Sequence, residues 1–174
     1  MRNFLYGLLA IVMATASHAQ MAKSEKAASN GVEISVNSDD FAGRYEYTAP
    51  TIRFKDGFAL IAIIKEGEEV RGPYIMGNMM YSDQSWRRYD QAILRGGEKV
   101  DAVFADRDVI SCRGSRYSGC TYSEGFQITL SADQLRRLSE VGTLDIQLKG
   151  VPGSEVILTV PASYFAAVKE VAGS

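Results

Sequence analysis

The chain has 174 residues, of which 46% are hydrophobic, and its 19 basic and 21 acidic residues give a formal net charge of −2. This length suits one domain with a hydrophobic core. A slightly acidic chain lacks the basic surface that nucleic-acid binding requires, so we expect no nucleic-acid partner.

Residues 1–19 have the pattern of a secretory signal peptide. A basic start at Arg2 precedes an apolar run over 4–16, and Ser17-His18-Ala19 offers small residues at the cleavage positions. The apolar run is shorter than the roughly 20 residues that a membrane-spanning helix needs, and no later run is longer. We therefore expect cleavage near Ala19, a protein that does not span the membrane, and a periplasmic or secreted location.

Residues 20–30 are polar and lack apolar periodicity, so the sequence predicts a flexible leader followed by a single domain over 31–174. Alternating apolar and polar residues predict strands over 32–36, 45–47 and 52–54. The Asp56-Gly57 pair predicts a hairpin turn. The apolar stretch 58–64 then predicts a central strand that is buried on both faces.

Further strands are predicted over 86–94, 100–110, 122–130, 144–148 and 156–160. Two helices interrupt this pattern. Ser131 to Gln134 form a capping box, and Pro161 precedes an apolar helical face near the carboxyl terminus. The sequence therefore predicts a mainly β fold: an antiparallel sandwich or barrel-like sheet with two short helices, one of them C-terminal.

Cys112 and Cys120 are the two cysteines of the chain, and they fall at the facing ends of two predicted strands. Cross-strand neighbours lie at a separation that suits a disulfide, and an oxidising compartment favours its formation. We therefore expect a disulfide that closes the hairpin, and no catalytic thiol.

Four short motifs in the second half of the chain resemble those of exported, β-rich proteins of unassigned function from Gram-negative bacteria. They are C-x-Y-x-E at 120–124, L-S-x-x-Q-L at 130–135, L-K-G at 148–150 and V-P-A-x-Y at 160–164. This resemblance implies an exported β domain, and it implies no catalytic residue.

The histidine content excludes the common catalytic relays. The one histidine, His18, lies in the predicted signal peptide, so a Ser-His-Asp or Cys-His site cannot form in the mature chain. A glycan hydrolase that uses two carboxylates stays open as an alternative, with four candidate acids: Asp39, Asp40, Glu124 and Asp145.

Two groups of residues suggest metal binding, and each has a simpler interpretation. Met76, Met79 and Met80 offer thioether ligands for Cu(I), but methionines beside aromatic residues also pack in cores or apolar patches. The acidic residues at 101, 106 and 108 could hold calcium, but they lack the spacing of the twelve-residue calcium loop and suit the protection of an edge strand. We expect the simpler interpretation in both cases, and no cofactor.

Arginine and aromatic side chains occur together at two places. The loop between the cysteines contains Arg113, Arg116 and Tyr117. The segment 86–89 contains Trp86, Arg87 and Arg88. Both residue types anchor interfaces, and a closed loop loses less freedom on binding. We therefore expect a non-enzymatic binding or envelope-associated module whose partner is an envelope protein or an anionic envelope polymer. A carboxylate hydrolase and a Cu(I)-binding protein are the alternatives.

Overall fold

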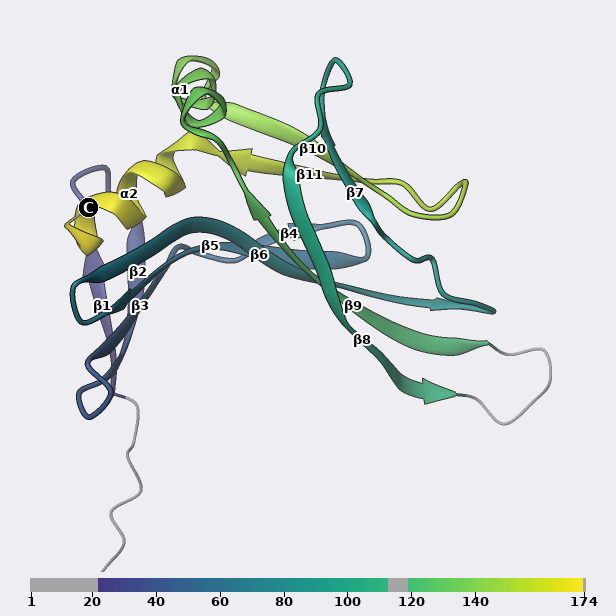
Figure 1. The fold of residues 1–174 in the computed structure, drawn as a ribbon, viewed down its shortest axis with the longest axis horizontal. Helices are drawn as coiled ribbons and strands as arrows, with labels where there is room; N and C mark the ends of the chain where they lie inside the picture. Colours follow the sequence, from purple (N-terminus) through teal and green to yellow (C-terminus); the bar gives the residue numbers. More distant parts are fainter. Residues whose placement is uncertain (1–21, 113–118, 174) are drawn as a thin grey trace, which may run out of the picture.

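The computed structural model describes residues 22–112 and 119–173, and over these ranges the chain forms two antiparallel sheets and two helices (Figure 1). The large sheet has the strand order β1-β2-β3-β5-β6-β9-β8, with β4 paired to β5. Its strands are β1 (Ala22–Ala27), β2 (Glu33–Asp39), β3 (Arg44–Thr48), β4 (Ile52–Phe54), β5 (Gly57–Glu66), β6 (Glu69–Asp83), β8 (Asp101–Cys112) and β9 (Cys120–Thr129).

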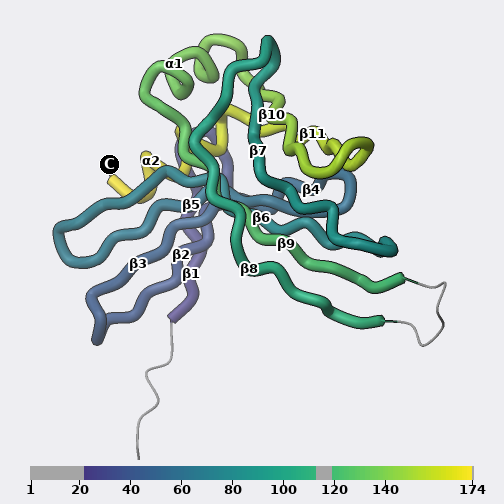
Figure 2. Tube along the Cα trace, turned by 45° about the vertical axis from the view of Figure 1, so that its right-hand side comes forward, coloured from purple at the N-terminus to yellow at the C-terminus, as the bar shows by residue number. Residues whose placement is uncertain are grey.

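The small sheet and both helices lie on one side of the large sheet, and no described residue outside that sheet covers its other face (Figures 1 and 2). The small sheet has the order β11-β10-β7. Its strands are β7 (Gln91–Leu94), β10 (Thr143–Lys149) and β11 (Val156–Pro161), and the helices are α1 (Ala132–Val141) and α2 (Ala162–Ala172). Over the described residues the sheets are not closed into a barrel. Of the two expected architectures, a sandwich or a barrel-like sheet, the structure fits the sandwich.

The core lies between the two layers. Ile61, Ile75 and Ile128 are neighbours on three adjacent strands of the large sheet, and all three are fully buried. Ile146 and Leu158 of the small sheet and Val168 of α2 are also fully buried. Period-two alternation on both sheets thus directs apolar side chains into one shared interior, as expected for a two-layer domain.

The expected flexible leader over 20–30 is wrong over most of its length, because residues 22–27 form β1. This strand pairs with β2, from Ala22 opposite Ser38 to Ala27 opposite Glu33. All six of its side chains are exposed, so no alternation of apolar residues marks it in the sequence. The main-chain hydrogen bonds to β2 hold it at the edge of the sheet.

Two expected elements form with changed limits. The hairpin at Asp56-Gly57 is centred one residue earlier, with Phe54 opposite Gly57 and a φ of 63° at Asp56. The strand predicted over 86–94 is shortened to β7, which begins at Gln91. Residues 87–89 donate their N–H groups to side chains instead of to a strand partner, as described below.

The helix limits agree closely with the sequence signals. The Ser131 hydroxyl accepts a hydrogen bond from the N–H of Gln134, the Gln134 side chain accepts one from the N–H of Ser131, and Gly142 ends α1 with a φ of 80°. Both capping interactions satisfy N–H groups that an isolated helix end leaves without partners. Neither of the two helices is long and apolar enough to cross a bilayer.

Cys112 and Cys120 lie opposite each other where β8 and β9 end, with their Sγ atoms 1.99 Å apart and their Cα atoms 4.1 Å apart. The expected pairing of the two cysteines is thus confirmed. The bond joins residues that are 8 positions apart and closes the loop that contains residues 113–118.

We expect the protein prepared under oxidising conditions to contain no titratable thiol after denaturation. Closing so short a loop restricts the unfolded chain, so the double Cys112→Ser, Cys120→Ser variant should lose about 2.5 kcal/mol of unfolding free energy. Urea denaturation of both proteins measures the loss. Two reactive thiols per wild-type chain, or an unchanged midpoint in the variant, would contradict this expectation.

Candidate functional site

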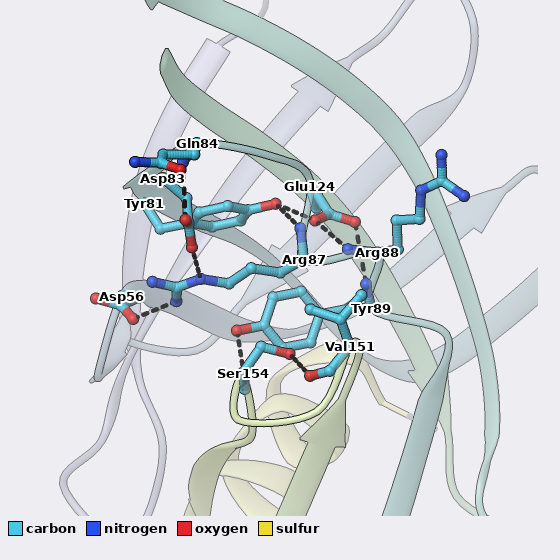
Figure 3. A network of polar contacts seen from close by, with 10 residues as sticks. All are labelled: Asp56, Tyr81, Asp83, Gln84, Arg87, Arg88, Tyr89, Glu124, Val151 and Ser154. Carbon is cyan, nitrogen blue, oxygen red and sulfur yellow. Dashed lines mark hydrogen bonds and ion pairs between the residues drawn. The ribbon is translucent and has the colours of Figure 1, made fainter. Parts of the chain in front are cut away.

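Glu124 is the most unusual residue of the interior. It lies on β9 between Tyr122 and Phe126 on the core side of the large sheet, and it is fully buried (Figure 3). A buried charge is unfavourable unless hydrogen bonds and an opposite charge compensate for it. The surroundings of Glu124 supply both.

Four donors occupy the two carboxylate oxygens of Glu124. The Tyr81 hydroxyl and the N–H of Arg88 (3.0 Å) donate to Oε1, while the N–H of Tyr89 (3.2 Å) and Nε of Arg107 (2.9 Å) donate to Oε2. The Arg107 guanidinium also donates to the carbonyl oxygen of Tyr89 at 2.9 Å. The carboxylate is therefore paired with a cation and enclosed by hydrogen-bond donors.

Three successive main-chain N–H groups point at this pair of side chains. The N–H of Arg87 donates to the Tyr81 hydroxyl at 2.8 Å, and those of Arg88 and Tyr89 reach the carboxylate. Successive N–H groups that converge in this way form an anion-binding nest, in which one residue takes a left-handed conformation. Arg88 is that residue, with a φ of 51°. The anion bound by this nest is the protein's own Glu124.

Burial and hydrogen bonding keep the nearby tyrosines protonated. Burial, followed by the hydrogen bond to Glu124, raises the pKa of Tyr81 well above its ordinary value. Burial also raises the pKa of Tyr89, whose hydroxyl donates to the carbonyl oxygen of Ser154 at 2.7 Å. Both hydroxyls therefore stay available as donors up to strongly alkaline pH.

The loop 84–90 joins the two sheets. The N–H of Asp90 donates to the carbonyl oxygen of Lys149 at 2.9 Å, and the N–H of Val151 donates to that of Arg87 at 2.7 Å. A side chain at Gly150 would place its Cβ 2.2 Å from the Arg87 carbonyl oxygen, so only glycine fits there. The nest thus fixes the loop against β9 on one side and against the β10–β11 turn on the other.

Arg87 was expected to bind a partner, but its side chain makes ion pairs and stacking contacts with other residues of the same chain. It lies 2.7 Å from Asp56 and 3.2 Å from Asp83, and it stacks on the Tyr81 ring at 4.3 Å (Figure 3). Burial alone would lower the pKa of Arg87, but the hydrogen bonds to Asp56 and its other partners raise it. The N–H of Gln84 and then Arg87 lower the pKa of Asp83.

Trp86 is also occupied, since its half-buried ring packs on Tyr122 with 4.5 Å between centroids. Arg88 differs from Trp86 and Arg87. Its side chain is exposed, points away from the network (Figure 3), and has no ion pair or hydrogen bond within the described residues. The remaining expected binding residues, Arg113, Arg116 and Tyr117, lie outside the described residues.

The structure does not bring the three methionines together. Met79 points into the core and is fully buried, while Met76 and Met80 lie on the opposite face of β6, with Met80 half exposed. The four candidate acids form no facing pair: Asp39 and Asp40 are consecutive residues at the end of β2, where Asp40 accepts a hydrogen bond from the Tyr45 hydroxyl, while Glu124 and Asp145 lie on other strands. Asp39 accepts hydrogen bonds within its own turn, Asp145 pairs with Arg95, and Glu124 is enclosed. No cluster of three acidic, cysteine or histidine side chains in the described ranges is placed to hold a metal ion.

Glu124 was one of several candidate acids in the sequence, and its position in the strand pattern could have singled it out. Tyr122, Phe126 and Ile128 share its inward phase, so a glutamate at that place must be buried. Its partners carry no such signal, because Arg107 resembles an edge charge and the nest donors are main-chain groups.

Comparison with protein families, with curated proteins and with solved structures finds no match for this chain.

We expect Glu124→Gln to lower the free energy of unfolding by about 3 kcal/mol, because an amide cannot accept all four donors and leaves Arg107 without its anion. Urea denaturation at neutral pH measures the effect. The exposed Glu155→Gln on the small-sheet side is the matched control and should change stability by less than about 0.5 kcal/mol. Equal, small effects of both substitutions would contradict the role given to Glu124.

A second prediction concerns alkaline pH. Because the pKa of Tyr81 is raised above its ordinary value of 10.0 in the folded protein, its contribution is fully present below about pH 10 and is lost as the pH rises further. Tyr81→Phe should therefore be less stable than the wild type at pH 8 and should lose less stability between pH 8 and pH 11. Tyr45→Phe, at an exposed position, should follow the wild-type profile. Parallel profiles for wild type and Tyr81→Phe would refute the prediction.

Proposed function

We propose that this protein is an exported binding module without catalytic activity, and that Arg88 contacts a negatively charged partner in the envelope, either a polymer or an envelope protein. The predicted signal peptide over 1–19 and the paired cysteines support export to the periplasm or the medium. Binding requires no cofactor.

The conformation of Arg88 is the observation that carries this proposal. A left-handed backbone costs an ordinary L-residue about 1–2 kcal/mol, whereas glycine and asparagine adopt it more readily. The fold uses only the N–H of Arg88 and makes no ion pair or hydrogen bond with its side chain within the described residues. A long cation at a position that favours glycine, held on a rigid loop, supports a role for this side chain outside the protein.

The chemistry of the interior supports binding rather than catalysis. The fully buried carboxylate of Glu124 has both oxygens occupied by donors, so it offers no free oxygen to a substrate. Paired-carboxylate hydrolysis needs two acids that face each other across a bond; the adjacent Asp39 and Asp40 accept hydrogen bonds within their own hairpin, and Glu124 and Asp145 lie on other strands.

The test compares retention of the protein on dextran sulfate and on uncharged dextran. Arg88→Asn removes the charge while keeping a residue that tolerates a φ of 51°. It should preserve or slightly raise stability and should weaken retention on dextran sulfate about threefold, the effect of one exposed ion pair. Retention should fall with added salt for the wild type.

Two control variants make the result specific. Arg88→Lys keeps the charge and should retain most of the binding, while Arg53→Asn removes an exposed arginine from β4 and should leave retention unchanged. Equal losses for Arg53→Asn and Arg88→Asn would show an effect of net charge alone. Unchanged retention of Arg88→Asn would overturn the proposal.

A further inference from the structure

The uncovered face of the large sheet contains a hollow of about 420 Å³. Its lining comes from five adjacent strands, β3, β5, β6, β9 and β8. In Figure 1, β1–β3 and β8–β9 both bend away from the helices, so the hollow lies on the inner side of a curved sheet. A volume of this size falls within the range of small-molecule sites.

A glycine on β9 opens part of the floor of this hollow. Gly125 faces the uncovered side, where an added Cβ would approach the carbonyl oxygen of Ala105 to 3.2 Å and the Cβ of Asp106 to 3.4 Å. Its cross-strand neighbours are Asn78 on β6 and Ala105 on β8, and the larger side chains of Phe58, Met76 and Val103 lie further out. The floor is therefore main chain, and the walls are side chains.

Apolar, accessible side chains make up much of the wall, beside the polar Asn78 and Gln127. Phe58 is 40% exposed and Val103 is 59% exposed, and the half-buried Met76 lies between them on β6. Within the described residues, neither sheet nor helix covers these side chains. A concave group of exposed apolar side chains marks a binding surface more often than scattered single residues do.

The charged residues of the lining are all acidic. Glu46 lies on β3 and Asp106 on β8, at opposite sides of the hollow, and no lysine or arginine lines it. Neither carboxylate makes an ion pair or side-chain hydrogen bond within the part of the chain that the structure describes. The hollow therefore combines apolar walls with two uncompensated negative charges.

We propose that this hollow binds an organic cation: an ammonium group that carries an apolar body. The apolar body fills the space over Gly125, and the positive group lies near Glu46 or Asp106, where the Phe58 ring face adds a cation–π interaction. An anionic amphiphile meets repulsion from both acids. A second copy of the same face would bring like charges together.

This site is independent of Arg88. The hollow lies on the uncovered face, whereas the nest around Glu124 lies on the core side of the same sheet. The two sites also have opposite charge, so each can fail without the other.

The test uses three probes with the same octyl chain and different head groups: octyltrimethylammonium, octyl glucoside and octyl sulfate, each below its micelle concentration. Backbone amide NMR of the disulfide-bonded protein should show saturable shifts around Gly125 with the cation. The neutral probe should bind about tenfold more weakly and the sulfate more weakly still. Equal affinities for the three probes, or shifts elsewhere on the molecule, would overturn the proposal.

Variants then separate charge from apolar contact. Glu46→Gln with Asp106→Asn should lower affinity for the cation toward that of the neutral probe, with the cation–π interaction of Phe58 as the remaining difference; asparagine suits position 106 because its φ is 52°. Val103→Ser should weaken binding of the cationic and the neutral probe alike. Glu155→Gln and Val70→Ser, which alter exposed residues away from the hollow, are the matched controls. Unchanged selectivity in the double variant, with its fold intact by NMR, would refute the role of the two acids.

Discussion

The burial of one carboxylate organises much of this fold. Because Glu124 lies in the interior, its charge must be compensated there, and the compensation comes from Tyr81, Arg107 and the N–H groups of residues 88 and 89. The loop that supplies those N–H groups also hydrogen-bonds to Lys149 of β10 and to Val151 in the β10–β11 turn. The requirement of a single side chain thus contributes, beside the shared apolar core, to how one layer sits on the other.

The small net charge conceals local differences in charge on the large sheet. On the core side, Arg87 and Arg107 are neutralised by internal acids, and Arg88 keeps its charge in solvent. On the uncovered side, Glu46 and Asp106 stand beside apolar side chains. Overall composition averages these regions, so it predicts the absence of a nucleic-acid footprint but not the local chemistry.

Elements with a local signal could be predicted from the sequence. The alternation of Ile34 and Val36 marks β2, the Ser131–Gln134 capping box marks α1, and the two cysteines end facing strands. The candidate site could not be predicted in the same way, because Tyr81 lies 43 positions from Glu124 and Arg107 lies 17 positions from it. Two further donors are main-chain groups, which leave no trace in residue type. Likewise, the hollow depends on sheet curvature and on the empty side of Gly125.

The first strand illustrates how main-chain bonding frees a segment from constraints on composition. β1 buries none of its six side chains and is joined to β2 by main-chain pairing, while Ser29, just beyond it, holds the chain to the Glu170 carboxylate of α2 through two hydrogen bonds. Its residue types can therefore change widely without opening the interior. For protein engineering, the residues of Ala22–Ala27 can therefore be replaced by an epitope, a labelling sequence or a protease site at the edge of the domain.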